Sequence, residues 1–238
     1  MRSCKSYSEY FEYSIGLRQG EIMSPVMFSL FVEDIELHMQ SKVDSGIQID
    51  DIMLIMLLFA DDMAIFAKTP EELQDHLNNL LSYCNSSGLH VNTNKTKVMV
   101  FRKRGGVKLN ENWSYDNNIL EVVDNFNYLG TIFNYTGNFS LNQEYLAGKA
   151  LMYNCKTNPL TPKTQCQLFD SFVGSILGYG SEIWGYTKSK EIERIHLTFL
   201  NRLLNVKQST NTAGVYGELG RFLLFTNRYV RIVKNLGF

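Results

Sequence analysis

Apolar residues recur with a helical period near the N-terminus, after a short segment that is typical of a strand. Residues 10–15 (YFEYSI) favour a strand, and residues 16–25 (GLRQGEIMSP) favour a loop. Ser24 is a good N-cap, and Pro25 suits the first helical position, where its missing N–H costs nothing. The apolar positions that follow have the spacing of one helix face, which extends to about residue 40; they are Phe28, Phe31, Val32 and Ile35.

A tight hairpin and a second helix are predicted next. Two apolar runs, 53–59 and 63–67, are separated only by the segment Ala-Asp-Asp at 60–62, which predicts a β-hairpin with carboxylates at its tip. Thr69, Pro70 and Glu72 then form a capping box that starts a helix ending at Gly88. The predicted buried face of this helix comprises Leu73, Leu77, Leu80, Leu81 and Cys84.

The second half of the chain changes from strand-like to helical spacing. Residues 89–101 predict a turn and a strand, 102–106 a basic loop, and 113–133 a shorter β region. After about residue 140 two helical stripes follow, the first beginning at Thr161–Pro162; they are Leu168, Phe172, Val173, Ile176 and Leu177, and then Ile192, Ile195, Phe199, Leu203 and Val206. The order predicts an α+β domain over residues 1–139 and a small all-α domain over 140–238.

Composition and charge place few restrictions on the function of the chain. The 238 residues are 45% hydrophobic and 20% charged with a net charge of -1, so the totals alone do not indicate a nucleic-acid binder. The cysteines at 4, 84, 155 and 166 show no C-x-x-C pair, which favours reduced core thiols without a disulfide partner. The longest apolar run, 52–60, is far shorter than the roughly 20 residues of a membrane helix, so no membrane partner is expected.

Asp61 and Asp62 are the strongest candidates for chemistry. Carboxylates next to apolar strands are costly unless their charge is stabilised, and two adjacent ones repel each other. A divalent cation such as Mg²⁺ reverses that balance, because it prefers carboxylate oxygens together with waters and phosphates. Two such ions can activate a hydroxyl and stabilise a leaving phosphate. The alternative interpretation is that the two aspartates only supply turn-forming side chains.

The neighbouring segments resemble, in order, the motifs of one enzyme family. FADD (59–62) is similar to the x-x-D-D hairpin of reverse transcriptases, their motif C, and GLRQGEIMSP is similar to motif B. GLHVNTNKTKVMVF (88–101) resembles motif D, and FNYLG (126–130) resembles motif E, the primer grip. YGSEIWGY (179–186) and VYGELGR (215–221) further resemble the region after the palm in LINE-type (non-LTR) retrotransposons. The resemblance implies a partial palm, with a hairpin and short strands on two packed helices, followed by a thumb-like helical domain.

The resemblance also implies roles for individual residues. Asp61 would be the principal metal ligand and Asp62 its secondary partner, with Phe59 packed beneath the turn and Ala60 leaving room for the primer end. Lys95, or as second choice Lys97, would protonate departing pyrophosphate. The template and nucleotide pocket would be formed by Arg18, Gln19, Gly20, Ser24 and Pro25 together with Phe59 and Ala60, and the primer grip by Tyr128, Leu129 and Gly130. The implied partners are an RNA template, a DNA primer and deoxynucleotides, and the implied location is nuclear or cytoplasmic.

Basic residues offer a further site of nucleic-acid contact. Lys95, Lys97, Arg102, Lys103, Arg104 and Lys108 form the densest basic stretch, and Arg194, Arg202 and Lys207 are expected on a later, thumb-like helix. Such residues can hold phosphates without reading sequence. The alternative is that these basic side chains only form a solvated surface and bind no nucleic acid.

One family element has no match in the sequence. Motif A supplies a further aspartate from a strand upstream of motif B, but only fifteen residues precede Gly16 and the first aspartate is Asp34. Because strand side chains alternate, Asp61 and Asp62 are not expected to face one metal pair together. The missing strand would also leave the apolar hairpin with an unpaired edge, which favours aggregation.

These features lead to two function hypotheses. The first is an RNA-directed DNA polymerase by descent, inactive as this chain alone and expected to bind Mg²⁺ (or Mn²⁺) only when a motif A aspartate is supplied. The second is a non-enzymatic nucleic-acid-binding remnant. An unrelated α+β domain with an incidental Asp-Asp turn is a third reading, which would be supported if residues 59–62 did not lie at a hairpin tip beside the helix beginning near Pro25.

Overall fold

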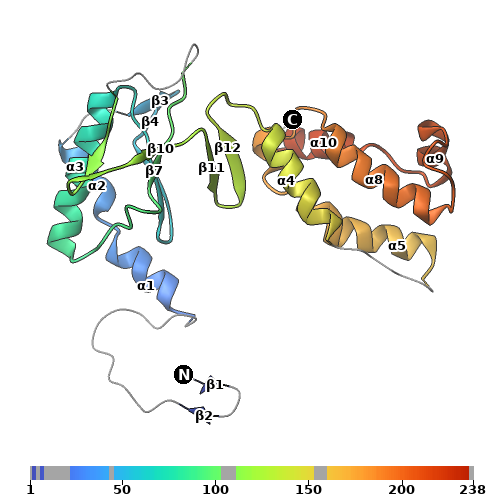
Figure 1. The fold of residues 1–238 in the computed structure, drawn as a ribbon, viewed down its shortest axis with the longest axis horizontal. Helices are drawn as coiled ribbons and strands as arrows, with labels where there is room; N and C mark the ends of the chain where they lie inside the picture. The colour runs from blue at the N-terminus through green and yellow to red at the C-terminus, as the bar shows by residue number, and fades with distance from the viewer. Residues whose placement is uncertain are drawn as a thin grey trace. The chain divides into compact units, whose positions relative to one another are not determined.

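The computed structural model describes residues 2–3, 6–7, 22–42, 46–102, 111–152 and 160–235 (Figure 1). The chain forms two compact units, one of residues 1–96 with 109–120 and one of residues 97–108 with 121–238. The domain boundary predicted after residue 139 lies inside the second unit and stays a prediction. Helices and short strands occur together, so the predicted α+β class is confirmed.

The first unit combines three helices with short antiparallel hairpins. Its helices are α1 (Ser24–Phe31), α2 (Ile35–Lys42) and α3 (Pro70–Ser87). Its strand pairs are β1 (Arg2–Ser3) with β2 (Ser6–Tyr7), β3 (Ile47–Ile49) with β4 (Ile52–Leu54), β5 (Met56–Phe59) with β6 (Asp62–Ile65), and β8 (Ser114–Tyr115) with β9 (Asn118–Ile119). In the described part of the chain every sheet has two strands.

Local signals fix α3, as predicted. The Thr69 side chain accepts a hydrogen bond of 3.2 Å from the Glu72 amide, which satisfies one of the free N–H groups at the helix start. The Glu72 carboxylate in turn accepts one of 2.9 Å from the Lys68 amide. At the other end Gly88 has a φ of +68°. Glycine adopts this left-handed conformation at little cost, whereas residues with a Cβ do not, so it often ends helices.

The helix predicted from Ser24 to about residue 40 is wrong in two respects. It is interrupted by a turn over residues 32–34, so α1 and α2 are separate. Helix α1 begins one residue early, with Met23 rather than Ser24 at the N-cap position and no side-chain cap. Val32, Ile35 and Met39 around α2 are buried, and α2 packs against α3, whereas α1 buries none of its residues.

The second unit is mainly helical. Two strand pairs precede the helices: β7 (Lys97–Val98) lies parallel to β10 (Glu121–Val122), and β11 (Asn125–Tyr128) is antiparallel to β12 (Thr131–Asn134). The helices are α4 (Ser140–Leu151), α5 (Pro162–Leu168), the π-helix η1 (Phe169–Val173), α6 (Gly174–Leu177), α7 (Ser181–Trp184), α8 (Lys190–Leu203), α9 (Thr212–Glu218) and α10 (Leu224–Asn235). None of the described helices is long and apolar enough to cross a membrane.

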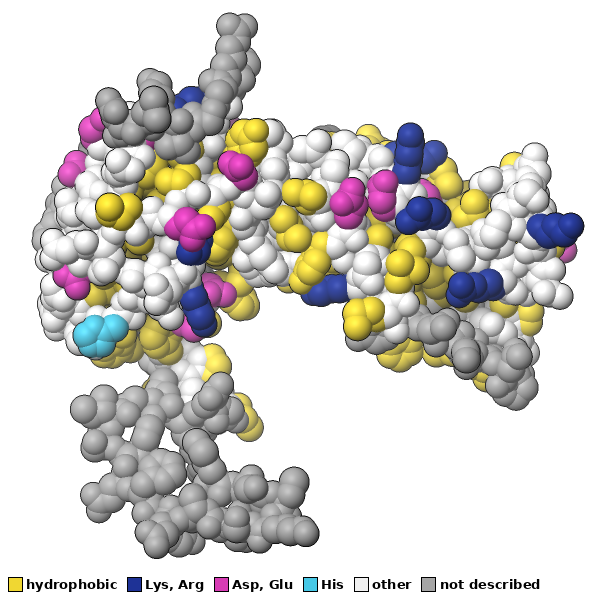
Figure 2. All heavy atoms as spheres, in the orientation of Figure 1, with side chains coloured by type: hydrophobic (Ala, Val, Ile, Leu, Met, Phe, Trp, Pro, Cys, Tyr) yellow, Lys and Arg dark blue, Asp and Glu magenta, His cyan; other side chains and the backbone are white. Residues whose placement is uncertain are grey.

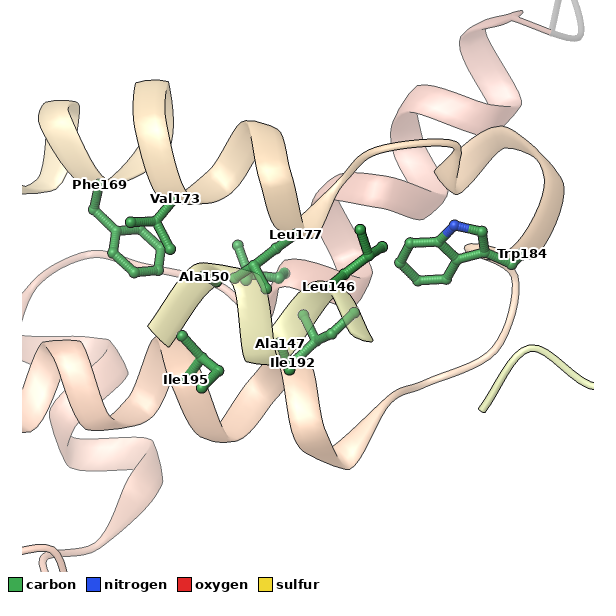
Figure 3. Packing of buried hydrophobic residues seen from close by; sticks show 10 residues of the cluster. Leu146, Ala147, Ala150, Phe169, Val173, Leu177, Trp184, Ile192 and Ile195 are labelled. Carbon is green, nitrogen blue, oxygen red and sulfur yellow. The ribbon is translucent and has the colours of Figure 1, made fainter. Parts of the chain in front are cut away.

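The core of the second unit lies between α4, α8 and the segment from η1 to α7. Figure 3 shows this cluster with Phe169 at one end and Trp184 at the other. Its members are Leu146, Ala147, Ala150, Phe169, Val173, Leu177, Trp184, Ile192, Ile195 and Leu224. The predicted stripe of the first helix here is partly wrong, because Phe172 is 56% exposed while Phe169 is buried. The wider turn of η1 shifts the residues away from α-helical spacing at this point.

Candidate functional site

The hairpin of β5 and β6 forms as predicted and carries both aspartates at its tip. Phe59 and Asp62 are the last paired residues, so Ala60 and Asp61 form a two-residue turn. Ala60 has a φ of +51°, in the left-handed region that residues with a side chain adopt at a cost. Strain of this kind is found at functional sites when the surrounding structure imposes it. Residues 59–62 therefore lie at a hairpin tip, as predicted.

The side chains around this turn face solvent. Asp61 and Asp62 are both exposed. Phe59, which was expected to pack beneath the turn, is 63% exposed. Leu57, two residues earlier on the same face of β5, is also 46% exposed, so this face of the hairpin is open at both positions. The turn is thus accessible to a large ligand but is not shielded from water.

The residues at the turn do not complete a two-metal centre. Asp61 belongs to the turn and Asp62 to the strand, and in the described part of the chain no group of three or more His, Cys, Asp or Glu side chains is placed to hold a metal ion. Two divalent ions that bridge substrate oxygens need more carboxylate ligands than this adjacent pair. The donor set present in the described residues therefore does not fit two-metal chemistry without a further carboxylate.

The predicted template and nucleotide pocket is only partly described. Arg18, Gln19 and Gly20 lie outside the described residues. Ser24 and Pro25 occupy the first turn of α1, where Ser24 is half-buried and Pro25 is exposed. Hydrophobic side chains extend along α1 at the lower edge of the first unit (Figure 2); the large exposed ones are Met23, Val26, Met27, Leu30 and Phe31. The helix that follows the predicted pocket thus presents an apolar surface.

The two lysines considered for proton transfer have different surroundings. Lys95 is exposed in a turn, where its backbone amide donates to the carbonyl of Asn92 at 3.1 Å. Lys97 is partly buried, and its Nζ forms an ion pair with Glu121 at 2.5 Å. A lysine bound to a carboxylate donates less readily to another group, so the geometry favours Lys95 over Lys97 for that role.

The predicted primer grip forms a second tight hairpin, in the second unit. Tyr128 and Thr131 close it, and Leu129 and Gly130 are its turn, with φ values of +48° and +82°. Two successive residues with positive φ match the twist of the flanking strands. The Oη of Tyr179 donates a hydrogen bond of 2.6 Å to the carbonyl of Leu129. Sequence patterns gave no indication of this contact, although Tyr179 opens the segment YGSEIWGY.

A buried carboxylate in the second unit also escaped sequence reasoning. Glu193 on α8 accepts hydrogen bonds from the amides of Leu224 (3.1 Å) and Phe225 (2.7 Å), and so caps the start of α10. Arg228 is buried beside it, 3.9 Å away and over the ring of Trp184. Burial lowers the pKa of Arg228, and Glu193 opposes that effect. Glu193 and Arg228 therefore serve a structural role in the second unit.

Comparison with known proteins identifies the family of the chain. The profile of "Reverse transcriptase (RNA-dependent DNA polymerase)" matches residues 2–133, which include the β5–β6 hairpin and the β11–β12 hairpin. The chain belongs to the reverse transcriptase family. Members of this family act on nucleic acids and nucleotides and generally use divalent metal ions.

Curated relatives of this chain come from mobile elements. A putative transposon-derived protein of Caenorhabditis elegans is 32% identical over 64% of this chain and 57% of its own length. The Pol polyprotein of the R2 element of Popillia japonica is 24% identical over 86% of this chain and 30% of its length, and that of R2DM of Drosophila melanogaster 28% over 66% and 15%. The predicted LINE-type affiliation is confirmed. The chain spans less than two thirds of each of these relatives.

Proposed function

We propose that this chain is the motif B to motif E portion of an RNA-directed DNA polymerase that uses two-metal nucleotidyl transfer. The observation that carries the proposal is the exposed Asp61–Asp62 pair at a strained two-residue turn, inside the region that matches the family. Its substrates would be an RNA template, a DNA primer and deoxynucleotides, and its metal Mg²⁺ or Mn²⁺. Family logic further suggests a nuclear or cytoplasmic location.

The same geometry leads us to propose that this polypeptide alone does not catalyse the reaction. Among the described residues no group of three or more His, Cys, Asp or Glu side chains could hold a metal ion, and the Asp61–Asp62 pair needs a third carboxylate for the metal pair. The test is primer extension on an RNA template with the purified chain in Mg²⁺ and in Mn²⁺. We expect no incorporation above background. Incorporation that Asp61→Ala abolishes and Asp51→Ala preserves would establish polymerase activity and refute inactivity.

A second candidate function is binding of a primer–template duplex without catalysis. It is supported by the exposed arginines Arg194 and Arg202 on α8 and by exposed Lys207 after it. Figure 2 shows several Lys and Arg side chains on the visible face of the second unit. Real phosphate contacts make affinity fall steeply with salt. Filter binding across salt concentrations should give a smaller salt slope for the double variant Arg194→Gln, Arg202→Gln, and an equal slope for wild type and double variant would contradict it.

A further inference from the structure

The β11–β12 hairpin depends on side chains from later elements for its position. In the described part of the chain it pairs with no third strand. Two hydrogen bonds attach its backbone to the helical region: the buried Asn142 of α4 accepts from the Ile132 amide at 2.9 Å, and Tyr179 donates to the Leu129 carbonyl at 2.6 Å. The first holds strand β12, and the second holds the turn itself.

The hairpin and the segment 179–180 approach each other closely at two glycines, Gly130 and Gly180. A Cβ atom at Gly130 would lie 3.2 Å from Cε1 of Tyr179, so only glycine allows the ring to approach this backbone without adjustment. The φ of +82° at Gly130 is also strained for any other residue. At the next residue, a Cβ on Gly180 would meet Oγ1 of Thr131 at 2.9 Å. The segment 179–180 and the turn therefore fit each other closely.

The core of the second unit fixes Tyr179 in turn. The Nε1 of Trp184 donates a hydrogen bond of 3.0 Å to the carbonyl of Tyr179, and the Trp184 side chain is fully buried at one end of the core cluster (Figure 3). A chain of contacts thus runs from the core through Trp184 and Tyr179 to the turn. The ring of Tyr179 nevertheless remains 50% exposed, so it borders the surface that the turn presents.

We infer that Tyr179 is a positioning residue for primer binding, which sets the conformation of the Leu129–Gly130 turn from the helical core. The inference rests on the proposed function and on the family resemblance, which assigns Tyr128, Leu129 and Gly130 to the primer grip. The tyrosine hydroxyl donates to the carbonyl of a turn residue, and the ring lies close enough to limit the movement of Gly130. Losing either contact should loosen the turn and weaken primer binding without unfolding the unit.

The test combines hydrogen exchange with binding of two nucleic acids by the full chain. Tyr179→Phe keeps the ring against Gly130 and removes the hydroxyl; Tyr186→Phe, at an exposed tyrosine, is the matched control. We expect Tyr179→Phe to speed amide exchange over residues 125–134 and to raise the Kd for a DNA primer annealed to RNA about 3- to 10-fold. Its Kd for the single-stranded RNA alone should be unchanged, which a general loss of structure would not allow.

A second variant makes the result independent of the hydroxyl. Gly130→Ala introduces a Cβ against the Tyr179 ring at a strained φ and should raise the same Kd. If Tyr179 acts through the turn, adding Tyr179→Phe to Gly130→Ala causes little further loss.

Three outcomes would overturn the inference. Equal primer–template binding by wild type and Tyr179→Phe removes the role of Tyr179 and leaves the proposed function intact. Equal losses for both nucleic acids show a general structural effect. Wild-type protein that does not prefer primer–template over single-stranded RNA contradicts the proposed primer grip, and the role of Tyr179 with it.

Discussion

The two units differ in how their exposed apolar side chains are distributed among the described residues. The second unit encloses a continuous core between α4, α8 and the segment from η1 to α7, and even its buried carboxylate, Glu193, is hydrogen-bonded. The first unit has a core around α2 and α3, but α1 and the hairpins carry large exposed apolar residues. The candidate catalytic turn thus lies on one of the elements of the first unit that expose apolar residues.

The difference teaches that apolar exposure among the described residues is concentrated on α1 and the hairpins in the first unit, whereas in the second unit it is spread over many elements. A surface with as many exposed Leu, Ile, Met and Phe side chains as α1 and the hairpins present is unusual for an isolated protein. The carboxylate pair on the same unit is likewise short of a complete metal site. Apolar contacts and metal ligands are therefore incomplete in the same unit.

The largest expected difference in stability is between two leucine-to-alanine substitutions, one in each unit. Leu177→Ala should lower the free energy of unfolding by about 4 kcal/mol, because Leu177 is 1% exposed in the core, whereas Leu30→Ala at a 59% exposed position should change it by less than about 0.5 kcal/mol. The chain has two tryptophans, Trp113 in the first unit and Trp184 in the second. Urea unfolding followed by Trp184 fluorescence in a Trp113→Phe background measures the effect of Leu177→Ala on the second unit, and Trp113 fluorescence in a Trp184→Phe background measures the effect of Leu30→Ala on the first. Similar losses for both variants would remove the contrast between the units.

The buried carboxylate of the second unit gives the next effect. Glu193→Ala removes the cap of α10 and leaves the charge of Arg228 buried without compensation, so we expect a loss of about 3 kcal/mol. Glu191→Ala on the same helix turn is the control. The double variant Glu193→Ala, Arg228→Met should recover part of the loss, which thermal unfolding can measure. A loss no larger than that of the control would mean that Glu193 does not stabilise the unit.

Acid should destabilise the second unit through His196. Burial, with a smaller contribution from Arg221, lowers the pKa of His196 from 6.5 to about 4. Between these values the unfolded chain binds a proton that the folded chain does not, so stability is fully present above pH 6.5 and falls as the pH decreases toward 4. The loss should be on the order of 2 kcal/mol. Urea unfolding at several pH values should show a flatter profile for His196→Leu but not for the exposed His90→Gln, and an unchanged profile for His196→Leu would refute this assignment.

The smallest effect on stability is expected at the uncovered hairpins. Ile52 is 68% exposed, so Ile52→Lys should change the free energy of unfolding by less than about 0.5 kcal/mol while it reduces self-association of the apolar surface. Gln48→Lys, at an exposed position paired with Met53 in the same hairpin, controls for the added charge. Light scattering against concentration provides the measurement. Equal self-association of the two variants would show that the exposed apolar surface is not its cause.

Sequence reasoning succeeded where the signal is local. The start of α3 at Thr69, its end at Gly88 and the Asp61–Asp62 hairpin tip each depend on a few adjacent residues with definite conformational preferences. The family resemblance depended on ordered short motifs and was confirmed as well.

Sequence-based prediction failed where contacts between residues far apart in the sequence decide the structure. The break at residues 32–34 and the exposure of Phe59 depend on which elements are present to cover an apolar face. The π-helix η1 exposes Phe172 and buries Phe169, which the periodicity alone does not indicate. Tyr179 contacts Leu129 fifty residues away, and no pattern within either segment predicts that pairing. Arg18, Gln19 and Gly20 lie outside the described residues, so their roles stay predictions.

Manganese binding counted by electron paramagnetic resonance tests the central claim most directly, namely that the Asp61–Asp62 turn has too few ligands for a metal pair. Mn²⁺ takes the same oxygen ligands as Mg²⁺ and reports its own free concentration. We predict no site tighter than about 1 mM in the wild-type chain and no change in Asp61→Asn. One or two Mn²⁺ ions bound below about 0.1 mM, and lost in Asp61→Asn, would contradict the account.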